Sequence, residues 1–361
     1  MSGKKTILHI IDYLGRGGAE VMLVKVLKEL TEYNNIVVTL NPRNHFGDEF
    51  KCDVYYSLNM GSFATFPIAV LKLKRLIKKH KIDLVHSHLF SATLVARLAT
   101  PQKIPLITTI HTNVNVSNDY KKWYIMLLES ISYKIHKSSI IAVSKGVLEQ
   151  YFAFLNHKPY KKYLLYTFVD INETADTPLP VTAIKKDTFT AIAIGALRYP
   201  KNQYYLIRAF ELLKNENIEL HIYGIGVMQK ELEQAVIDAG VKIIMKGEVK
   251  DVSKLMPQYD VYVMPSEFEG FSLSVLEAMV MQMPMLLSDI PSFREQCADT
   301  AIFFDLNNTT DFVNKLKQLA ADKTLCNTIA AAAKQRVVNN FTLQHHMAGL
   351  RKIYTQTLNN N

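Results

Sequence analysis

Cysteine, long apolar runs and paired acidic motifs are all scarce in this chain of 361 residues. Its three cysteines are an odd and scattered set, which argues against a disulfide framework and against a cysteine-rich metal cluster. No apolar stretch approaches the ~20 residues of a transmembrane helix, so any membrane contact is expected to be peripheral. The apolar run near the N-terminus is broken by Asp12 and Arg16, which argues against a signal peptide. These absences favour a protein of the reducing cytoplasm.

The positive charge is concentrated in one half of the chain. Residues 1–170 contain 23 Lys and Arg against 12 Asp and Glu, a net charge of +11. Residues 171–361 contain 19 against 21, a net charge of −2. A basic half joined to a near-neutral half predicts two different partners. Nucleic acid is not expected among them, because no recognition motif accompanies the charge.

Short apolar strands alternate with amphipathic helices along the chain. In the first half, strands are expected at 7–11, 36–40, 83–86, 105–110 and 139–143. In the second half, they are expected at 190–195, 219–223, 242–246, 260–264 and 284–287. The segment 170–189 interrupts the pattern and is interpreted as a linker. The sequence therefore predicts an α/β fold with two Rossmann-like, doubly wound domains (1–170 and 171–340) that face each other across a cleft.

The segment after the expected strand 260–264 carries the strongest chemical signal. It reads Pro-Ser-Glu-Phe-Glu-Gly-Phe-Ser-Leu-Ser-Val-Leu-Glu-Ala-Met and places Glu269 and Glu277 eight positions apart. One glutamate in the first turn of a helix could simply stabilise the helix dipole. That explanation does not account for Glu277, whose apolar neighbours are expected to be buried.

Gly270 in this segment lets the backbone approach a ligand closely. The amides that follow it are expected at a helix N-terminus, a favourable place for phosphate or sugar oxygens. These amides belong to Phe271, Ser272 and Leu273.

This pattern resembles the signature of retaining glycosyltransferases of family 4, which have the GT-B fold. The resemblance extends over nearly the whole chain and is weakest at 43–66 and in the linker. It implies that Glu269 lies beside the donor sugar, that Glu277 binds the nucleotide ribose and that the amides between them cradle sugar and diphosphate. It also implies that residues 1–170 bind the acceptor and 171–340 the donor, with a last helix (341–361) crossing back onto the first domain.

A second loop, Gly195-Ala-Leu-Arg-Tyr-Pro-Lys-Asn202, follows the strand 190–195. Arg198 and Lys201 in this loop are expected to stabilise the diphosphate as it leaves. The resemblance matches at Gly195 and Lys201, whereas Ala196 stands where the family usually has arginine. Arg198 is interpreted as the replacement for that arginine; the alternative is that both cations are solvated loop residues.

The loop Gly15-Arg-Gly-Gly-Ala-Glu20 follows the first strand and offers backbone amides at Gly17 and Gly18. Glu20 stands where a dinucleotide fingerprint has its third glycine, and no acidic residue follows the second strand, so a dehydrogenase is disfavoured. In the resembled family this loop faces the donor phosphates and the acceptor. The alternative is a tight strand-to-helix turn without a ligand.

His111 follows the strand 105–110, where the resemblance implies a histidine near the hydroxyls of the donor sugar. His86 and His88 end an earlier strand; metal ligation is possible from their spacing, but an indirect or acceptor-side role is favoured. Gly224 ends the strand 219–223 like the family's glycine turn near the nucleotide. Val249 lies where the family's backbone holds the base.

The function predicted is a retaining, metal-independent glycosyltransferase. It would move a sugar from a nucleotide-diphosphate donor, most simply a UDP-sugar, to a hydroxyl of a lipid-linked or cell-surface polysaccharide such as a lipopolysaccharide. No metal or other cofactor is expected, because the sequence has no Asp-x-Asp motif. Basic helices at 68–82 and 119–137 predict a peripheral contact with an anionic membrane. Two alternatives remain: another sugar-nucleotide enzyme of this architecture, epimerase- or phosphorylase-like, and a non-catalytic nucleotide-sugar binding module.

Overall fold

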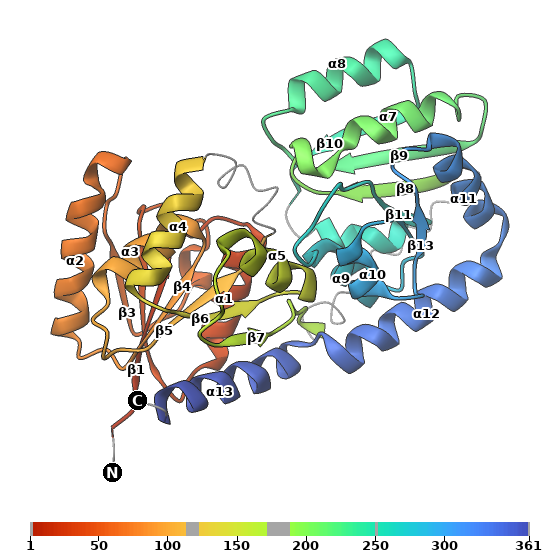
Figure 1. Cartoon of the computed structure of the whole chain (residues 1–361). Helices are drawn as coiled ribbons and strands as arrows, with labels where there is room; N and C mark the ends of the chain where they lie inside the picture. The colour runs from red at the N-terminus through yellow and green to blue at the C-terminus, as the bar shows by residue number, and fades with distance from the viewer. Residues whose placement is uncertain (1–2, 113–122, 172–187, 250–251, 360–361) are drawn as a thin grey trace. The chain divides into compact units, whose positions relative to one another are not determined.

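The structure, a computed structural model, describes residues 3–112, 123–171, 188–249 and 252–359 (Figure 1). It divides the chain into two units. The first comprises Met1–Thr167 and Gln344–Asn361, and the second comprises Phe168–Leu343. Each unit contains one parallel sheet with helices packed against it. The prediction of two Rossmann-like α/β domains is therefore confirmed.

The sheet of the first unit has the strand order β3-β2-β1-β4-β5-β6-β7, with all neighbours parallel. Its order reverses between β1 and β4, and ligands of such sheets bind beyond the carboxyl ends of the strands at that point. The strands are β1 (Thr6–Ile11), β2 (Asn34–Thr39), β3 (Val54–Ser57), β4 (Leu84–His88), β5 (Leu106–Ile110), β6 (Ser139–Ala142) and β7 (Lys162–Leu164).

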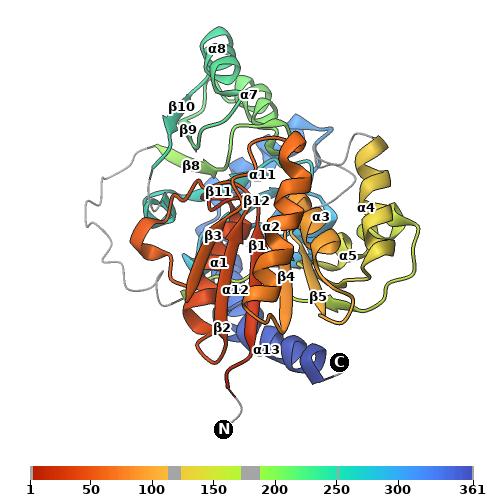
Figure 2. The ribbon, with the colours of Figure 1, turned by 90° about the vertical axis from the view of Figure 1, so that its left-hand side faces the viewer.

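Helices cover both faces of this sheet because its strands are apolar at consecutive positions, and consecutive side chains point to opposite faces. In β1, Leu8 and Ile10 belong to a core with α2 and α3, while Ile11 belongs to a second core with α1. Figure 2 shows α2 and α3 over the sheet. The helices are α1 (Gly18–Glu29), α2 (Phe66–Lys79), α3 (Phe90–Ala99), α4 (Trp123–Ile135) and α5 (Lys145–Leu155).

The last helix, α13 (Leu343–Asn359), is grouped almost entirely with the first unit. The hydroxyl of its Tyr354 lies 2.6 Å from His86 Nδ1 in β4. Arg351 forms an exposed ion pair with Glu32 at 2.6 Å. These contacts attach the end of the chain to the sheet formed by its beginning.

The sheet of the second unit has the order β10-β9-β8-β11-β12-β13, again with parallel neighbours. Here the order reverses between β8 and β11. The strands are β8 (Phe189–Ile194), β9 (Ile218–Tyr223), β10 (Ile243–Gly247), β11 (Val261–Met264), β12 (Met285–Ser288) and β13 (Ile302–Phe304). The helices are α7 (Gln203–Glu211), α8 (Gln229–Ala239), α9 (Leu273–Val280), α10 (Pro291–Cys297), α11 (Thr309–Ala321) and α12 (Lys323–Asn340).

Several elements differ from the predicted pattern. The strands β3, β7 and β13 occur where none was expected, and each lies at or next to the edge of its sheet. The helix-forming composition of residues 309–337 predicts one helix there, but the structure has two, because Asp322 ends α11 and caps α12 by accepting the Leu325 amide. The predicted linker falls mostly on residues 172–187, outside the described residues. Among the described helices, none is long and apolar enough to cross a membrane.

Candidate functional site

The two loops at the reversal point of the second sheet bring Lys201 and Glu269 together. Lys201 follows β8 and Glu269 follows β11, and β8 pairs directly with β11. Lys201 Nζ donates to Glu269 Oε1 at 2.6 Å, and the two side chains are 15% and 14% exposed. Ser266 Oγ also donates to Oε1, at 2.8 Å. Oε2 receives no hydrogen bond from the described residues, so it can accept one from a ligand.

Local backbone geometry places the Lys201 ammonium. Tyr199–Lys201 form a single 3-10 turn, which Asn202 ends in the left-handed conformation at φ 50°. Gln203 closes the loop by donating to the Ala196 carbonyl at 3.2 Å. The Lys201 chain then lies over Gly195, where a Cβ would stand 3.4 Å from its Cδ and Cε.

Arg198 lies on the outer side of the same loop. Leu197 is buried, whereas Ala196 and Arg198 are both exposed. Arg198 forms no ion pair with another described residue. Positions 196 and 198 are therefore both open to solvent in this loop.

Gly224 is required by close backbone packing. A Cβ at Gly224 would lie 2.0 Å from the Gly195 carbonyl oxygen, and its φ of +139° disfavours any side chain. The Gly195 amide donates to the Tyr223 carbonyl at 3.0 Å. Gly224 thus lets the loop after β9 pack on the loop that carries Lys201. Val249 lies beyond β10 and is 38% exposed.

The start of α9 differs in one respect from the predicted set of open amides. The Ser272 amide donates to Gln296 Oε1 at 3.0 Å, and Gln296 Nε2 donates to the Ser272 carbonyl at 2.8 Å. Gln296 therefore already satisfies the backbone of Ser272. Phe271 is buried with its ring against Phe341. Gly270 is also buried, and Leu273 is half-buried.

Glu277 lies one turn after Leu273 on α9 and is half-buried, unlike the buried residues on either side of it. The charges of Glu269 and Glu277 both affect the pKa of the buried Tyr262 hydroxyl. Burial raises the pKa of Tyr262 well above its usual value, and the charges of the two glutamates raise it further. Both carboxylates of the predicted signature thus lie near one tyrosine of β11.

In the first unit, the loop after β1 presents its backbone to solvent. Gly17 and Gly18 are exposed, and Gly17 caps α1. A Cβ at Gly17 would meet the Glu20 carboxylate at 2.5 Å, whereas one at Gly18 would meet nothing within 4 Å. Burial raises the pKa of Glu20.

His111 lies directly after β5 and is half-buried. His88 Nδ1 lies 3.2 Å from His111 Nε2, so His88, at the end of β4, orients the His111 ring. Burial, together with a smaller effect of the nearby His346, lowers the pKa of His111 to about 4. His111 is therefore neutral at pH 7, able to donate or accept a hydrogen bond but not to supply a positive charge.

Two further histidines complete a cluster that the sequence did not indicate. His9 in β1 and His346 in α13 line a cavity of about 20 Å³ together with His86, His88 and His111. Ring nitrogens of His9, His86 and His88 lie within 4.8 Å of one another. Burial lowers the pKa of His9 and of His346 to about 4. His9 sits in an apolar strand and His346 in a helix of mixed polarity far along the chain, so only the fold brings them to His88.

Two family models match consecutive parts of the chain. Residues 16–173 match the model for "Glycosyltransferase Family 4", and residues 177–336 match "Glycosyl transferases group 1".

Curated relatives and solved structures agree with these matches. A galactosyltransferase of Escherichia coli, named for transfer from UDP-Gal to GlcNAc-diphosphoundecaprenol in α-1,3 linkage, is 24% identical over 79% of this chain and 78% of that protein. An α-N-acetylgalactosaminyltransferase of Campylobacter jejuni that acts on a diphospho-undecaprenol-linked sugar is 26% identical over 90% and 92%. HepE of Anabaena, solved with UDP, has a TM-score of 0.83 at 18% identity, over 97% of this chain and 100% of that one.

Proposed function

The chain is a glycosyltransferase of the family-4 kind with the GT-B fold, and we propose that it is a retaining, metal-independent enzyme that uses a UDP-sugar. The acceptor is a hydroxyl of a lipid-linked or polysaccharide glycan. The observation that carries this proposal is the Lys201–Glu269 pair, built at the strand-order reversal of the second sheet with Glu269 Oε2 left open.

Lys201 and Arg198 supply the positive charge that the departing diphosphate requires. The Lys201 ammonium has three N–H donors, of which Glu269 uses one, so two can bind phosphate oxygens. Such pre-positioned cations stabilise charge that grows in the transition state. This arrangement takes the place that a divalent cation has in other glycosyltransferases, and the reaction then needs no metal.

Glu269 Oε2 accepts a hydrogen bond from a hydroxyl of the donor sugar, while Lys201 holds the other carboxylate oxygen. His111 donates to or accepts from the sugar as a neutral imidazole, and Glu277 binds the ribose. Holding the donor in one orientation lowers the activation barrier, because the entropy of orienting the reactants is lost on binding and not in the transition state. The bond between the anomeric carbon and the diphosphate then breaks, and the acceptor oxygen bonds to that carbon from the same face. The hydroxyl proton passes to the departing phosphate oxygen, and the anomeric configuration is kept.

The relatives support the donor and the stereochemistry. The Escherichia coli enzyme is named for a UDP-sugar and both curated relatives for an α linkage, which is what retention gives when the nucleotide sugar is α-linked. Their acceptors carry diphosphoundecaprenol, so a lipid-linked glycan is the acceptor class we infer. A lipid acceptor also agrees with a location at the inner face of the cytoplasmic membrane and with a basic first unit.

The test is a transfer assay with UDP-, GDP- and ADP-sugars, each with and without a diphosphoundecaprenol-linked acceptor. We expect acceptor-dependent release of UDP, unchanged by EDTA, and a product whose one-bond C–H coupling at the new anomeric carbon matches that of the donor. An inverted product would exclude the retaining mechanism. Loss of turnover in EDTA that Mg²⁺ restores would exclude metal independence.

A further inference from the structure

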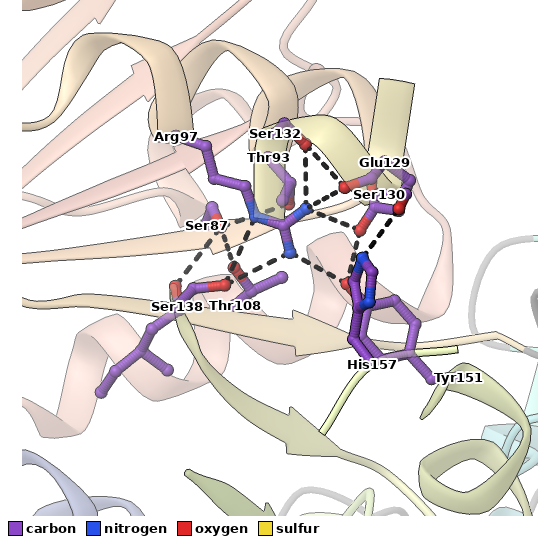
Figure 3. A network of polar contacts seen from close by, with 11 residues as sticks. Ser87, Thr93, Arg97, Thr108, Glu129, Ser130, Ser132, Ser138, Tyr151 and His157 are labelled. Carbon is purple, nitrogen blue, oxygen red and sulfur yellow. Dashed lines mark hydrogen bonds and ion pairs between the residues drawn. The ribbon is translucent and has the colours of Figure 1, made fainter. Parts of the chain in front are cut away.

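Helix α4 buries its polar side chains and presents its apolar ones. Figure 3 shows the buried side, where Arg97 of α3 reaches Glu129 of α4. Arg97 Nη1 lies 2.8 Å from Glu129 Oε1, and neither side chain is exposed. Arg97 also donates to Ser132 Oγ at 3.1 Å and to the Tyr151 hydroxyl at 2.9 Å. This network fixes which side of α4 faces the sheet.

The opposite side of α4 is apolar from Trp123 to Ile131 and ends at the exposed Lys134 and Ile135. Trp123 is 73% exposed, and Leu127, Ile131 and Ile135 are between 45% and 48% exposed. Tyr124, Met126 and Leu128 are exposed as well. A buried ion pair costs free energy through desolvation, and a contiguous apolar surface in water is unfavourable. The second of these costs becomes smaller if the apolar side of α4 is in contact with an apolar phase such as the interior of a bilayer.

A cationic pocket lies at the C-terminal end of this apolar face. It has a volume of about 430 Å³ and includes Ile135 of the exposed stripe, which joins the two surfaces. Its charged lining residues are Lys134, Lys137 and Lys161; no carboxylate of the described residues lines it or pairs with these lysines. The Thr357 hydroxyl, buried in the wall, has no hydrogen-bond partner among the described residues. The pocket thus offers donors to an anion.

We propose that this pocket binds the phosphate headgroup of an anionic membrane lipid while the exposed face of α4 lies in the interfacial layer of the bilayer. The inference rests on the peripheral membrane contact proposed above and gives that contact a site. A soluble phosphate would need the lysines but not the apolar stripe. A lipid needs both, side by side, as Ile135 places them.

The experiment is co-sedimentation of the full chain with phosphatidylcholine vesicles containing none or about 30% phosphatidylglycerol. Changing Lys134, Lys137 and Lys161 to Gln should weaken binding to the anionic vesicles about tenfold or more. The matched control changes Lys28, Lys51 and Lys352 to Gln and removes the same charge; all three are exposed lysines of the first unit outside the basic helices 68–82 and 119–137. We expect that control to weaken binding less than threefold or so; an equal loss would mean general charge attraction and would overturn the headgroup site.

The apolar stripe is tested by Leu127→Ser with Ile131→Ser, two exposed positions whose replacement should not disturb folding, as circular dichroism would check. We expect this variant to bind anionic vesicles more weakly and to keep its sedimentation coefficient in solution. A dimer that the variant dissociates, with vesicle binding unchanged, would show that the face meets a second copy and would overturn the proposal. A second result would also overturn it. The wild-type protein would bind inorganic phosphate or glycerol phosphate but not vesicles, and the lysine variant would lose that phosphate binding.

Vesicle binding is measured without turnover, so it can fail independently of the glycosyltransferase proposal. Both variants should retain transfer to a short-chain, water-soluble acceptor, because none of the changed residues belongs to the donor site. Loss of that activity together with vesicle binding would indicate that the variant is misfolded. Vesicle binding by the single variants Lys134→Gln, Lys137→Gln and Lys161→Gln would then decide between misfolding and loss of the headgroup site.

Discussion

At the scale of single residues, the Lys201–Glu269 pair places opposite charges side by side where we propose that the sugar and diphosphate of the donor bind. A partly buried pair of this kind is stronger than an exposed one, because less water screens it. Removing one partner leaves the other charge without compensation. The two residues are therefore expected to act as one functional group.

Lys201→Ala should lower kcat by a factor of about 10²–10³, the range observed when one pre-positioned donor to a developing negative charge is removed. Glu269→Gln should also lower kcat, because the neutral amide neither holds Lys201 as firmly nor accepts as strongly from the sugar. Steady-state kinetics with saturating acceptor would measure both effects. Lys214→Ala, at an exposed position of the same unit, is the control. Wild-type kcat in either site variant would refute the assignment.

The position of the second cation can be tested by moving it. Arg198→Ala should reduce kcat/KM for the donor by about tenfold or more, because a charge-assisted contact to the diphosphate is lost. Adding Ala196→Arg to that variant should restore much of the activity, since positions 196 and 198 are both exposed in the loop. If Arg198→Ala is silent, the arginine is a solvated loop residue. If the double variant stays as impaired as the single one, the two positions are not equivalent.

The sequence predicted that Glu269, Lys201 and His111 each follow a strand, and the structure has them there. Their catalytic roles stay predictions. The sequence did not predict Gln296, which pairs with Ser272 from 24 positions away. A side chain that bonds to a distant backbone amide belongs to no local sequence motif, so the sequence around it does not predict the contact. His9 and His346 were missed for a related reason: they are far apart in the sequence, and only strand order and the return of α13 bring them together.

At the scale of elements, alternation predicted central strands well and edge strands poorly. Central parallel strands are buried on both faces and read as short apolar runs. The edge strand β3 is Val-Tyr-Tyr-Ser and β7 is Lys-Tyr-Leu, and the residues of both are half-buried or exposed. Their sequences therefore lack the apolar signal. The break between α11 and α12 was likewise hidden, because a single capping aspartate interrupts an otherwise helical composition.

The Gln296–Ser272 contact should stabilise the start of α9. In Gln296→Ala, the buried Ser272 amide loses its partner, whereas the Ser272 carbonyl still accepts from the Leu276 amide. An unsatisfied buried group costs about 1–3 kcal/mol. The free energy of unfolding of the second unit should fall by about 2 kcal/mol or more in urea titrations. Gln234→Ala, which removes an exposed amide from α8, should change it by less than about 0.5 kcal/mol. Equal effects would show that the contact contributes no more than a surface one.

At the scale of the whole molecule, the uneven charge predicted from the sequence has a structural counterpart. The lysines of the pocket at the end of α4 belong to the basic first unit. In the near-neutral second unit, Arg198 and Lys201 lie in one loop after β8. The first set of charges is where we propose that a membrane lipid binds, and the second is where we propose that the diphosphate binds.

The histidine cluster should make the stability of the first unit depend on pH. Burial lowers the pKa of His9 from 6.5 to about 4, so between these values the unfolded chain binds more protons than the folded one. Stability is therefore full above pH 6.5 and is lost as the pH falls towards 4. For His9 the shift corresponds to about 3 kcal/mol. Buried carboxyl groups contribute their own pH dependence, so the comparison must be between variants.

His9→Gln keeps an N–H that can donate to Asn35 Oδ1 but cannot be protonated in this range. Its free energy of unfolding should fall less steeply than that of the wild type between pH 6.5 and 4. Urea unfolding followed by hydrogen–deuterium exchange of β1 and β4 peptides would report on this unit alone. His45→Gln, which removes an exposed histidine, should keep the wild-type slope. If His9→Gln and the wild type lose stability in parallel, the neutral, buried state of His9 does not limit the acid tolerance of the fold.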